Sequence, residues 1–127
     1  MERFIEREIK LTQTYLRVEM SMIGEDISLI LYGGEKPHIG CTVLSIPRES
    51  LTGHGIGVTS SVANVLGHKD EVICRKMAEQ IAIHANRVVT CTGGFHIDHL
   101  DPSMIHEVNH ATDWLIEELL QEIKKIK

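Results

Sequence analysis

The stretch Gly33-Gly34-Glu35-Lys36-Pro37-His38-Ile39-Gly40 joins two apolar runs, residues 26–32 and residues 41–46. Adjacent glycines permit backbone angles with φ > 0 that other residues avoid, while Pro37 fixes its own φ and holds Lys36 in extended conformations. The connection between the two runs therefore has a defined shape. His38 leaves this connection just before the second run begins.

Two later junctions repeat this arrangement of a histidine close to glycine. They are Gly67-His68-Lys69-Asp70 and Gly93-Gly94-Phe95-His96-Ile97-Asp98, and each lies at the end of an apolar run. Three glycine-adjacent histidines at three element ends predict one shared pocket.

The N-terminal part of the sequence has the apolar and polar alternation that is typical of strands. Residues 9–22 alternate apart from one irregularity near Gln13-Thr14, so we expect one strand with a bulge there. Gly24-Glu25-Asp26 predicts a turn, and residues 27–32 return as the second strand of an antiparallel hairpin. Residues 1–8 are compatible with a helix.

Two more strands are expected before the first helix. Residues 41–46 form the third and end at Pro47, and residues 58–66, rich in β-branched and small side chains, form the fourth. Between them, residues 48–57 hold three glycines within five positions, which predicts a loop that is mobile or ordered by a ligand.

Helical periodicity appears twice in the second half of the chain. Residues 69–86 form an amphipathic helix with Asn86 as its expected stop, and residues 87–92 predict a fifth strand. Asp101-Pro102 is a strong helix start, and an apolar stripe continues from there to the chain end. The stripe of the first helix consists of Ile73, Met77 and Ile81.

The element order is thus ββββαβα, in a single domain over residues 1–127. Each element must bury its one apolar face against another layer, so the sequence predicts an α+β fold, a mostly antiparallel sheet with two helices packed on one face. The edges of so small a sheet are exposed, and we therefore expect a homo-oligomer.

Composition limits the classes of partner. The net charge is −5, the only basic cluster is at the C-terminus, and 4% of residues are aromatic, so we expect no nucleic acid partner. The N-terminus lacks the apolar run of a signal peptide, and no segment approaches the roughly 18 apolar residues of a membrane helix. Three cysteines far apart in sequence fit a reduced chain. We expect a cytoplasmic protein without a membrane partner.

Two of the glycine-histidine junctions carry groups able to hold an anion or a proton. Gly67-His68-Lys69-Asp70 places free backbone N–H groups, a histidine and a lysine at a helix start, where a phosphate or carboxylate can dock. In an extended backbone His96 and Asp98 face the same way, so they can share a ligand, a proton or a metal. Each also has an ordinary structural interpretation, as a surface lysine beside a turn and as a satisfied histidine.

Metal binding and nucleophilic catalysis have less support. His106, His110 and Asp113 share one helix face at a spacing that suits a divalent metal, but they lie beside the apolar stripe, which favours a solvated or subunit-facing surface. The cysteines have apolar surroundings, where a thiolate is disfavoured. We therefore expect no metal and no catalytic nucleophile.

In its glycine-histidine blocks the chain resembles a known family. Residues 33–40, 67–70 and 92–98, in this order and spacing, look like the three blocks of the prenylated flavin chaperone-like family typified by the small D subunit of gallate decarboxylase. The resemblance spans nearly the whole chain. It implies a non-catalytic accessory protein for UbiD-type decarboxylases, which binds or hands over prenylated FMN or FMN, or helps the decarboxylase mature.

The family has no settled catalytic residues, so the resemblance implies ligand contacts alone. Lys69 and His68 at the helix start are expected to hold a phosphate, while His38 and His96 contact a polar edge of the flavin ring. Residues 53–57 are expected to form a lid. The candidate cofactor-binding residues are Gly34, Lys36, His38, Gly40, His68, Lys69, Gly94, His96 and Asp98.

Two other functions stay open beside this one. The first is a small lyase or isomerase that uses His38 or His96 with Asp98 as an acid–base pair on a small anionic substrate. The second is a metal-binding or purely structural assembly protein. Whether the chain is an enzyme is therefore open, and the resemblance favours a role without catalysis.

Overall fold

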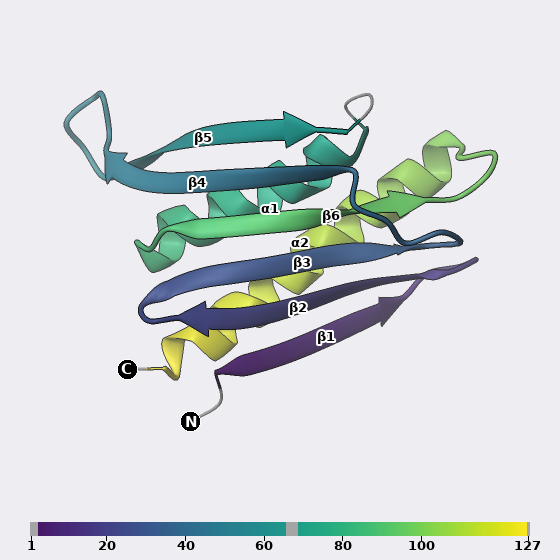
Figure 1. Cartoon of the computed structure of the whole chain (residues 1–127), viewed down its shortest axis with the longest axis horizontal. Coiled ribbons are helices and arrows are strands. Elements are labelled where there is room, and N and C mark those ends of the chain that lie inside the picture. The colour runs from purple at the N-terminus through teal and green to yellow at the C-terminus, as the bar shows by residue number, and fades with distance from the viewer. Residues whose placement is uncertain (1–2, 66–68, 127) are drawn as a thin grey trace.

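The computed structural model describes residues 3–65 and 69–126 and shows a six-stranded sheet with two helices on one face (Figure 1). The sheet order is β1-β2-β3-β6-β4-β5. The strands are β1 (Phe4–Lys10), β2 (Tyr15–Ile23), β3 (Asp26–Gly34), β4 (Cys41–Glu49), β5 (Ile56–Asn64) and β6 (Val89–His96), and the helices are α1 (Lys69–Ala85) and α2 (Pro102–Lys124). Within the described ranges, neither helix is long and apolar enough to cross a membrane.

One pair of neighbouring strands is parallel, and it decides where the site lies. β6 runs parallel to β3, whereas the other neighbouring pairs of this sheet are antiparallel. β6 enters the sheet after β4, β5 and α1 and inserts between β3 and β4. The carboxyl ends of β3 and β6 therefore lie side by side, and α1 begins near the same edge, at the right of Figure 1. Ligand sites in sheets with parallel strands commonly form at such an edge.

The core lies between the sheet and the helices. Alternate residues of the central strands point toward the helices and are buried. Both helices bury the apolar stripes expected from the sequence, except that Ile105, where the stripe of α2 begins, is exposed. Burial of one large apolar side chain contributes about 1.5–3 kcal/mol, so these stripes fix both helices on one face. The largest fully buried side chains include Leu16, Met20, Ile27, Leu29, Leu31, Met77, Ile81, Leu115 and Leu119.

The α+β class, the mostly antiparallel sheet and the two helices on one face are confirmed, and the element order matches from Asp26 onward. The prediction for residues 9–22 is wrong: they belong to two strands joined by a tight link, in which the Leu11 N–H donates to the Thr14 carbonyl at 2.8 Å. This link has neither glycine nor proline, and the buried Leu11 continues the apolar alternation into it. Residues 4–8, compatible with a helix in the sequence, are strand.

Strands β3, β4 and β6 extend further than the sequence predicts, and β3 continues to Gly34, so the first glycine pair lies inside it. Pro47 does not end β4, which continues to Glu49, because β6 pairs with β4 only over Cys41–Ser45 and the proline pairs with β5 alone. A strand tolerates proline where no neighbour needs the missing N–H. β6 continues through Gly93-Gly94 to His96, so the second glycine pair lies inside the strand.

Asp101 begins α2 as the sequence predicts. Its Oδ1 accepts hydrogen bonds from the Met104 N–H at 3.0 Å and from the Ser103 hydroxyl at 2.8 Å. The backbone bond from Met104 is the main cause that lowers the pKa of Asp101. A carboxyl group whose folded pKa is depressed stabilises the fold above its unfolded pKa of about 3.9, and this contribution is lost as the pH falls through the folded pKa.

We expect Asp101→Ala to lower the melting temperature at neutral pH by a few degrees, because the helix loses its N-cap. Asp101→Asn keeps an acceptor for the Met104 N–H, so it should melt close to the wild type at neutral pH and differ from it in its acid dependence. Thermal unfolding followed by circular dichroism at pH 7 and pH 3 measures both effects. Equal melting of wild type and Asp101→Ala at neutral pH would contradict the assignment.

Candidate functional site

The candidate site lies at the edge where β3 and β6 end and α1 begins. Gly34 pairs with His96 there and has φ +86°, and the N–H groups of Glu35 and Lys36 donate to the His96 carbonyl at 2.7 and 3.3 Å. A Cβ atom on Gly34 would lie 2.2 Å from that carbonyl oxygen. Only glycine therefore lets the chain turn around the end of β6 at this point.

Asp70, in the first turn of α1, connects three segments of the site. Its buried carboxylate accepts the Phe95 N–H at Oδ1 (2.9 Å) and faces His38 Nε2 at Oδ2 (3.0 Å). The other ring nitrogen of His38 lies 3.0 Å from the Lys36 carbonyl oxygen. Both ring nitrogens thus face oxygen atoms. With the Asp70 carboxylate ionised, both contacts are hydrogen bonds when each ring nitrogen carries a hydrogen, and His38 and Asp70 then make an ion pair.

Two glycines make room for this pair. A Cβ atom on Gly40 would lie 1.9 Å from Asp70 Oδ2, and one on Gly94 would lie 2.8 Å from His38 Nε2. Gly40 is also tied to β6, because its N–H donates to the Gly93 carbonyl at 2.8 Å. These glycines therefore shape the site through the space they leave.

A second polar chain runs from the start of α1 to the loop after β6. Lys69 Nζ lies 3.4 Å from His96 Nδ1, and His96 Nε2 lies 3.1 Å from Asp98 Oδ1. Because an ammonium group can only donate, His96 accepts at Nδ1 and donates from Nε2 to the carboxylate. The His38 and His96 rings meet edge to face with centroids 6.4 Å apart. The two histidines therefore share one site, as the sequence predicts.

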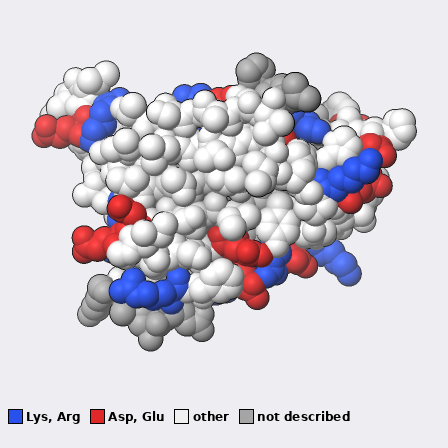
Figure 2. Space-filling view, in the orientation of Figure 1, with Lys and Arg blue, Asp and Glu red and all other residues white. Residues whose placement is uncertain are grey.

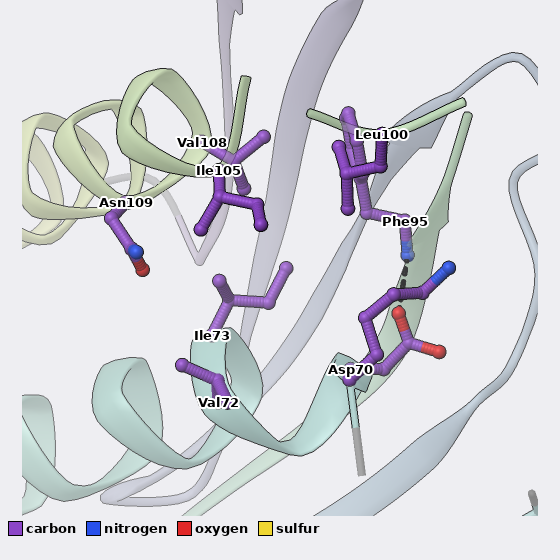
Figure 3. A pocket seen from close by; sticks show the side chains of 9 residues that line it. Asp70, Val72, Ile73, Phe95, Leu100, Ile105, Val108 and Asn109 are labelled. Atoms are coloured by element: carbon purple, nitrogen blue, oxygen red, sulfur yellow. Dashed lines mark hydrogen bonds between the residues drawn. The ribbon is translucent and has the colours of Figure 1, made fainter. Parts of the chain in front are cut away.

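An apolar cleft opens next to this polar cluster, between the N-terminal halves of the two helices (Figure 3). Its volume is about 210 Å³. Val72 and Ile105, from opposite helices, are 57% and 47% exposed, so apolar surface is open to solvent here. The residues that line the cleft are Lys69, Asp70, Val72, Ile73, Phe95, Leu100, Ile105, Val108 and Asn109. Lys69 and Asp70 therefore belong to both the cleft and the polar cluster.

Every candidate residue that the structure describes lies at this edge, and His68 lies outside the described residues. Lys36 contributes its backbone, since its carbonyl faces His38. The sequence missed three features: Asp70 as the centre of the site, Glu35, whose carboxylate accepts the Asp98 N–H at 2.8 Å, and the cleft. Asp70 belongs to the sequence block of residues 67–70. An acidic residue in the first turn of a helix is common, however, so its presence alone did not indicate a role in a ligand site.

The prediction that residues 53–57 form a lid over the site is wrong. β4 starts beside the site at Cys41 and carries the chain to the opposite edge before the glycine-rich loop begins, at the left of Figure 1. Nine extended residues cover about 26 Å, so residues 53–57 cannot close over His38.

The structure offers little for metal or nucleophile chemistry. No group of three or more metal-ligating side chains is gathered within the described residues. His106 and His110 stack with centroids 6.4 Å apart, but the carboxylate of Asp113 pairs with Lys76 at 2.5 Å. The three cysteines are buried; burial raises the pKa of Cys41, and the hydrogen bond with Cys91 raises that of Cys74. Neutral thiols are poor nucleophiles.

The sequence of this chain matches, over residues 10–124, the family described as the prenylated flavin chaperone LpdD-like domain. The chain belongs to this family. Protein LpdD of Lactiplantibacillus plantarum (strain ATCC BAA-793 / NCIMB 8826 / WCFS1) is a relative of this LpdD-like chain, 27% identical over 103 residues, which cover 80% of the chain and 71% of the relative. The match includes the site, because all of its described residues lie within residues 10–124.

The LpdD-like chain also resembles a solved structure that carries a different description. A chain in the crystal structure of a novel chaperone complex for yeast 20S proteasome assembly aligns with a TM-score of 0.54 and 23% identity, over 96% of this chain and 94% of that one. At this identity the likeness shows the fold alone. It supports the six-stranded sheet with two helices on one face as a recurring architecture.

Proposed function

We propose that this LpdD-like chain is a non-catalytic accessory protein that binds a phosphorylated, prenylated flavin at the edge of β3 and β6 and delivers it to a UbiD-type decarboxylase. Membership of a flavin chaperone family supports the accessory role. The observation that carries the ligand assignment is the position of Lys69, which stands between a polar cluster and an apolar cleft.

Lys69 is suited to an anionic group. It is the first residue of α1, where free backbone N–H groups and the positive end of the helix dipole attract anions. Among the described residues its ammonium contacts the lone pair of His96 and no carboxylate. Its charge is therefore available to a phosphate. His38 and His96 lie next to it, and each would contact the polar edge of the ring by exchanging one of the partners that its ring nitrogens have here.

The cleft is suited to the apolar part of the same ligand. Pockets that enclose a whole drug-sized ligand measure about 300–1,000 Å³, so a cleft of about 210 Å³ holds part of a flavin rather than all of it. Its apolar walls are Val72 and Ile73 of α1, Ile105 and Val108 of α2, and Phe95 and Leu100 between them in sequence. We propose that it takes the carbon atoms that prenylation adds, which distinguishes the modified cofactor from FMN.

We expect Lys69→Ala to weaken the binding of prenylated FMN by about tenfold, because one partly screened ion pair with phosphate contributes on the order of 1–2 kcal/mol. Melting should be unchanged. Lys124→Ala is the matched control, since it removes an exposed lysine from the last turn of α2. Anaerobic fluorescence titration measures the affinity, and native mass spectrometry confirms the adduct.

Unchanged affinity in Lys69→Ala would remove this residue from the site. Absence of any flavin adduct on the wild type would reject the proposed function as a whole. Delivery has its own readout, the rate at which an apo decarboxylase gains activity when prenylated FMN is presented with and without the chain. The cytoplasmic location and the homo-oligomer expected from the sequence stay predictions.

The acid–base alternative has one observation in its favour. His96 and Asp98 lie within hydrogen-bond distance, as a general acid–base pair requires. The open space beside them is mainly apolar, however, which suits binding of carbon surface better than turnover of a small anion. A lyase or isomerase therefore remains the second candidate.

A further inference from the structure

The imidazole ring of His96 lies between groups of opposite charge. Lys69 Nζ is 3.4 Å from His96 Nδ1, and His96 Nε2 is 3.1 Å from Asp98 Oδ1. The first contact needs a lone pair on Nδ1, because an ammonium group can only donate. The second contact needs a hydrogen on Nε2, because an ionised carboxylate can only accept. The ring is therefore neutral in this arrangement, with its one hydrogen on Nε2.

The other titratable ring at the site is engaged elsewhere. His38, from the loop after β3, meets His96 edge to face with ring centroids 6.4 Å apart. Its Nε2 faces the carboxylate of Asp70 and its Nδ1 faces the Lys36 carbonyl oxygen. The hydrogen-bonding atoms of His38 are thus directed at groups other than His96.

Two charged residues of the loop after β3 approach the end of β6 through backbone contacts. The N–H groups of Glu35 and Lys36 donate to the His96 carbonyl, and the Glu35 carboxylate accepts the Asp98 N–H at 2.8 Å. These contacts hold the loops in place without touching the imidazole. Within residues 3–65 and 69–126, the charged side chains that hydrogen-bond to the ring of His96 are those of Lys69 and Asp98.

A ligand phosphate that takes Lys69 changes what His96 requires. Nδ1 then loses its donor, and its new neighbour is a phosphate oxygen or a carbonyl oxygen of the flavin ring, both of which are acceptors. A hydrogen is therefore needed on Nδ1. It cannot come from Nε2, because a bare ring nitrogen would then face the Asp98 carboxylate at 3.1 Å. Asp98 thus prevents the ring from shifting its one hydrogen, and the ring must gain a second one.

We propose that the site takes up one proton together with its phosphorylated ligand. His96 receives this proton at Nδ1 when Lys69 turns to the phosphate, and Asp98 is the positioning residue that makes the uptake necessary. The proton comes from the solvent, and the N–H bond at Nδ1 is the one covalent bond that forms. The bound state then places two cations, Lys69 and His96, between the anionic ligand and the Asp98 carboxylate, which favours charge-assisted hydrogen bonds.

The inference rests on the proposed function and adds to it a means of release. The side chains of His96 and Asp98 are 36% and 62% exposed, so solvent protons reach this pair directly. The site edge lies at the right of Figure 1, and Figure 2 shows basic and acidic groups side by side at the surface on that margin. A histidine in ordinary surroundings is mostly neutral above about pH 7. Loss of the added proton therefore weakens the hold on the ligand.

The test is the affinity for prenylated FMN between pH 7.5 and pH 8.5, measured by anaerobic fluorescence titration at constant ionic strength. The second ionisation of a phosphate monoester lies near pH 6, so the phosphate of the ligand stays a dianion over this range. Uptake of one proton lowers the affinity about tenfold for each pH unit. Calorimetry in buffers with different ionisation enthalpies counts the same proton directly.

Asp98→Asn should bind prenylated FMN with an affinity that changes less than about twofold over this range. The amide group of asparagine can donate to a bare Nε2, so the hydrogen of His96 can shift to Nδ1 and no proton is needed. The backbone contact of residue 98 with Glu35 is kept, so a purely structural role of Asp98 would leave the pH dependence unchanged. His96→Gln should lose the pH dependence as well. His110→Gln is the control, since it removes an exposed histidine of α2 and should keep the tenfold dependence.

The ¹⁵N chemical shifts of His96 give a second readout, which needs no ligand. In the free protein at pH 8 the hydrogen should be on Nε2, and a hydrogen on Nδ1 would overturn the inference. Binding of prenylated FMN with equal affinity at pH 7.5 and pH 8.5 would overturn it too and leave the proposed function standing. So would a pH dependence that Asp98→Asn retains. A wild type that binds no prenylated FMN at any pH would reject the proposed function and this inference together.

Discussion

Gly93→Ala is expected to abolish stable folding. Gly93 lies in β6, where it pairs with Leu31 of the neighbouring parallel strand. A Cβ atom there would lie 1.7 Å from the Leu31 carbonyl oxygen, and φ at this position is +156°, which L side chains rarely adopt. The clash is with backbone in the centre of the sheet, so no flexible side chain can move away. We expect a cost of at least about 4 kcal/mol, a large part of the roughly 5–15 kcal/mol that stabilises a typical domain.

The measurement is denaturant unfolding of purified protein, with the soluble yield as a first indication. Gly53→Ala is the matched control, because Gly53 also has positive φ (+81°) but nothing lies within 4 Å of its added Cβ. It should cost only the roughly 1–2 kcal/mol of a left-handed backbone. If Gly93→Ala is as stable as Gly53→Ala, then β3 and β6 are not packed as the structure has them.

The fold could be predicted from the sequence wherever local periodicity and local packing agree. The stripe of α1, the N-cap at Asp101 and the β2–β3 hairpin each need only neighbouring residues for their recognition. The β1–β2 link could not be recognised, because its residues include no turn-favouring glycine or proline and Leu11 is buried within it. The prediction that the strand ends at Pro47 was wrong for a related reason, because whether proline ends a strand depends on which neighbouring strand pairs with it.

The sequence predicted most residues of the site, but it did not predict that Asp70 connects them. Glycine beside histidine is a local signal, and it correctly placed His38 and His96 together. The role of Asp70 depends on β6 inserting next to β3, because only then does the Phe95 N–H meet the first turn of α1. That insertion is a long-range crossover, which periodicity does not encode. The cleft likewise arises from two helices that meet through tertiary packing.

The site gives the second large prediction. Asp70→Ala removes the acceptor of the buried Phe95 N–H and the partner of His38 in one step. A buried donor left without a partner costs about 1–3 kcal/mol, and the loss of the charge-assisted contact adds to it. We expect the free energy of unfolding to fall by about 2–4 kcal/mol. Amide exchange at Phe95 should become markedly faster, and prenylated FMN binding should weaken more than in Lys69→Ala, because His38 loses its anchor.

Asp70→Asn separates the two contacts of this carboxylate. Asparagine Oδ1 can still accept from Phe95, so slow amide exchange and most of the stability should return. Its amide group, however, presents a donor to His38 Nε2, which must then accept, while Nδ1 keeps its hydrogen for the Lys36 carbonyl. The neutral ring should be visible in its ¹⁵N chemical shifts. Slow Phe95 exchange in Asp70→Ala would show that this amide has another partner. An unchanged His38 ring in Asp70→Asn would show that the contact with Asp70 does not determine which ring nitrogens of His38 carry hydrogens.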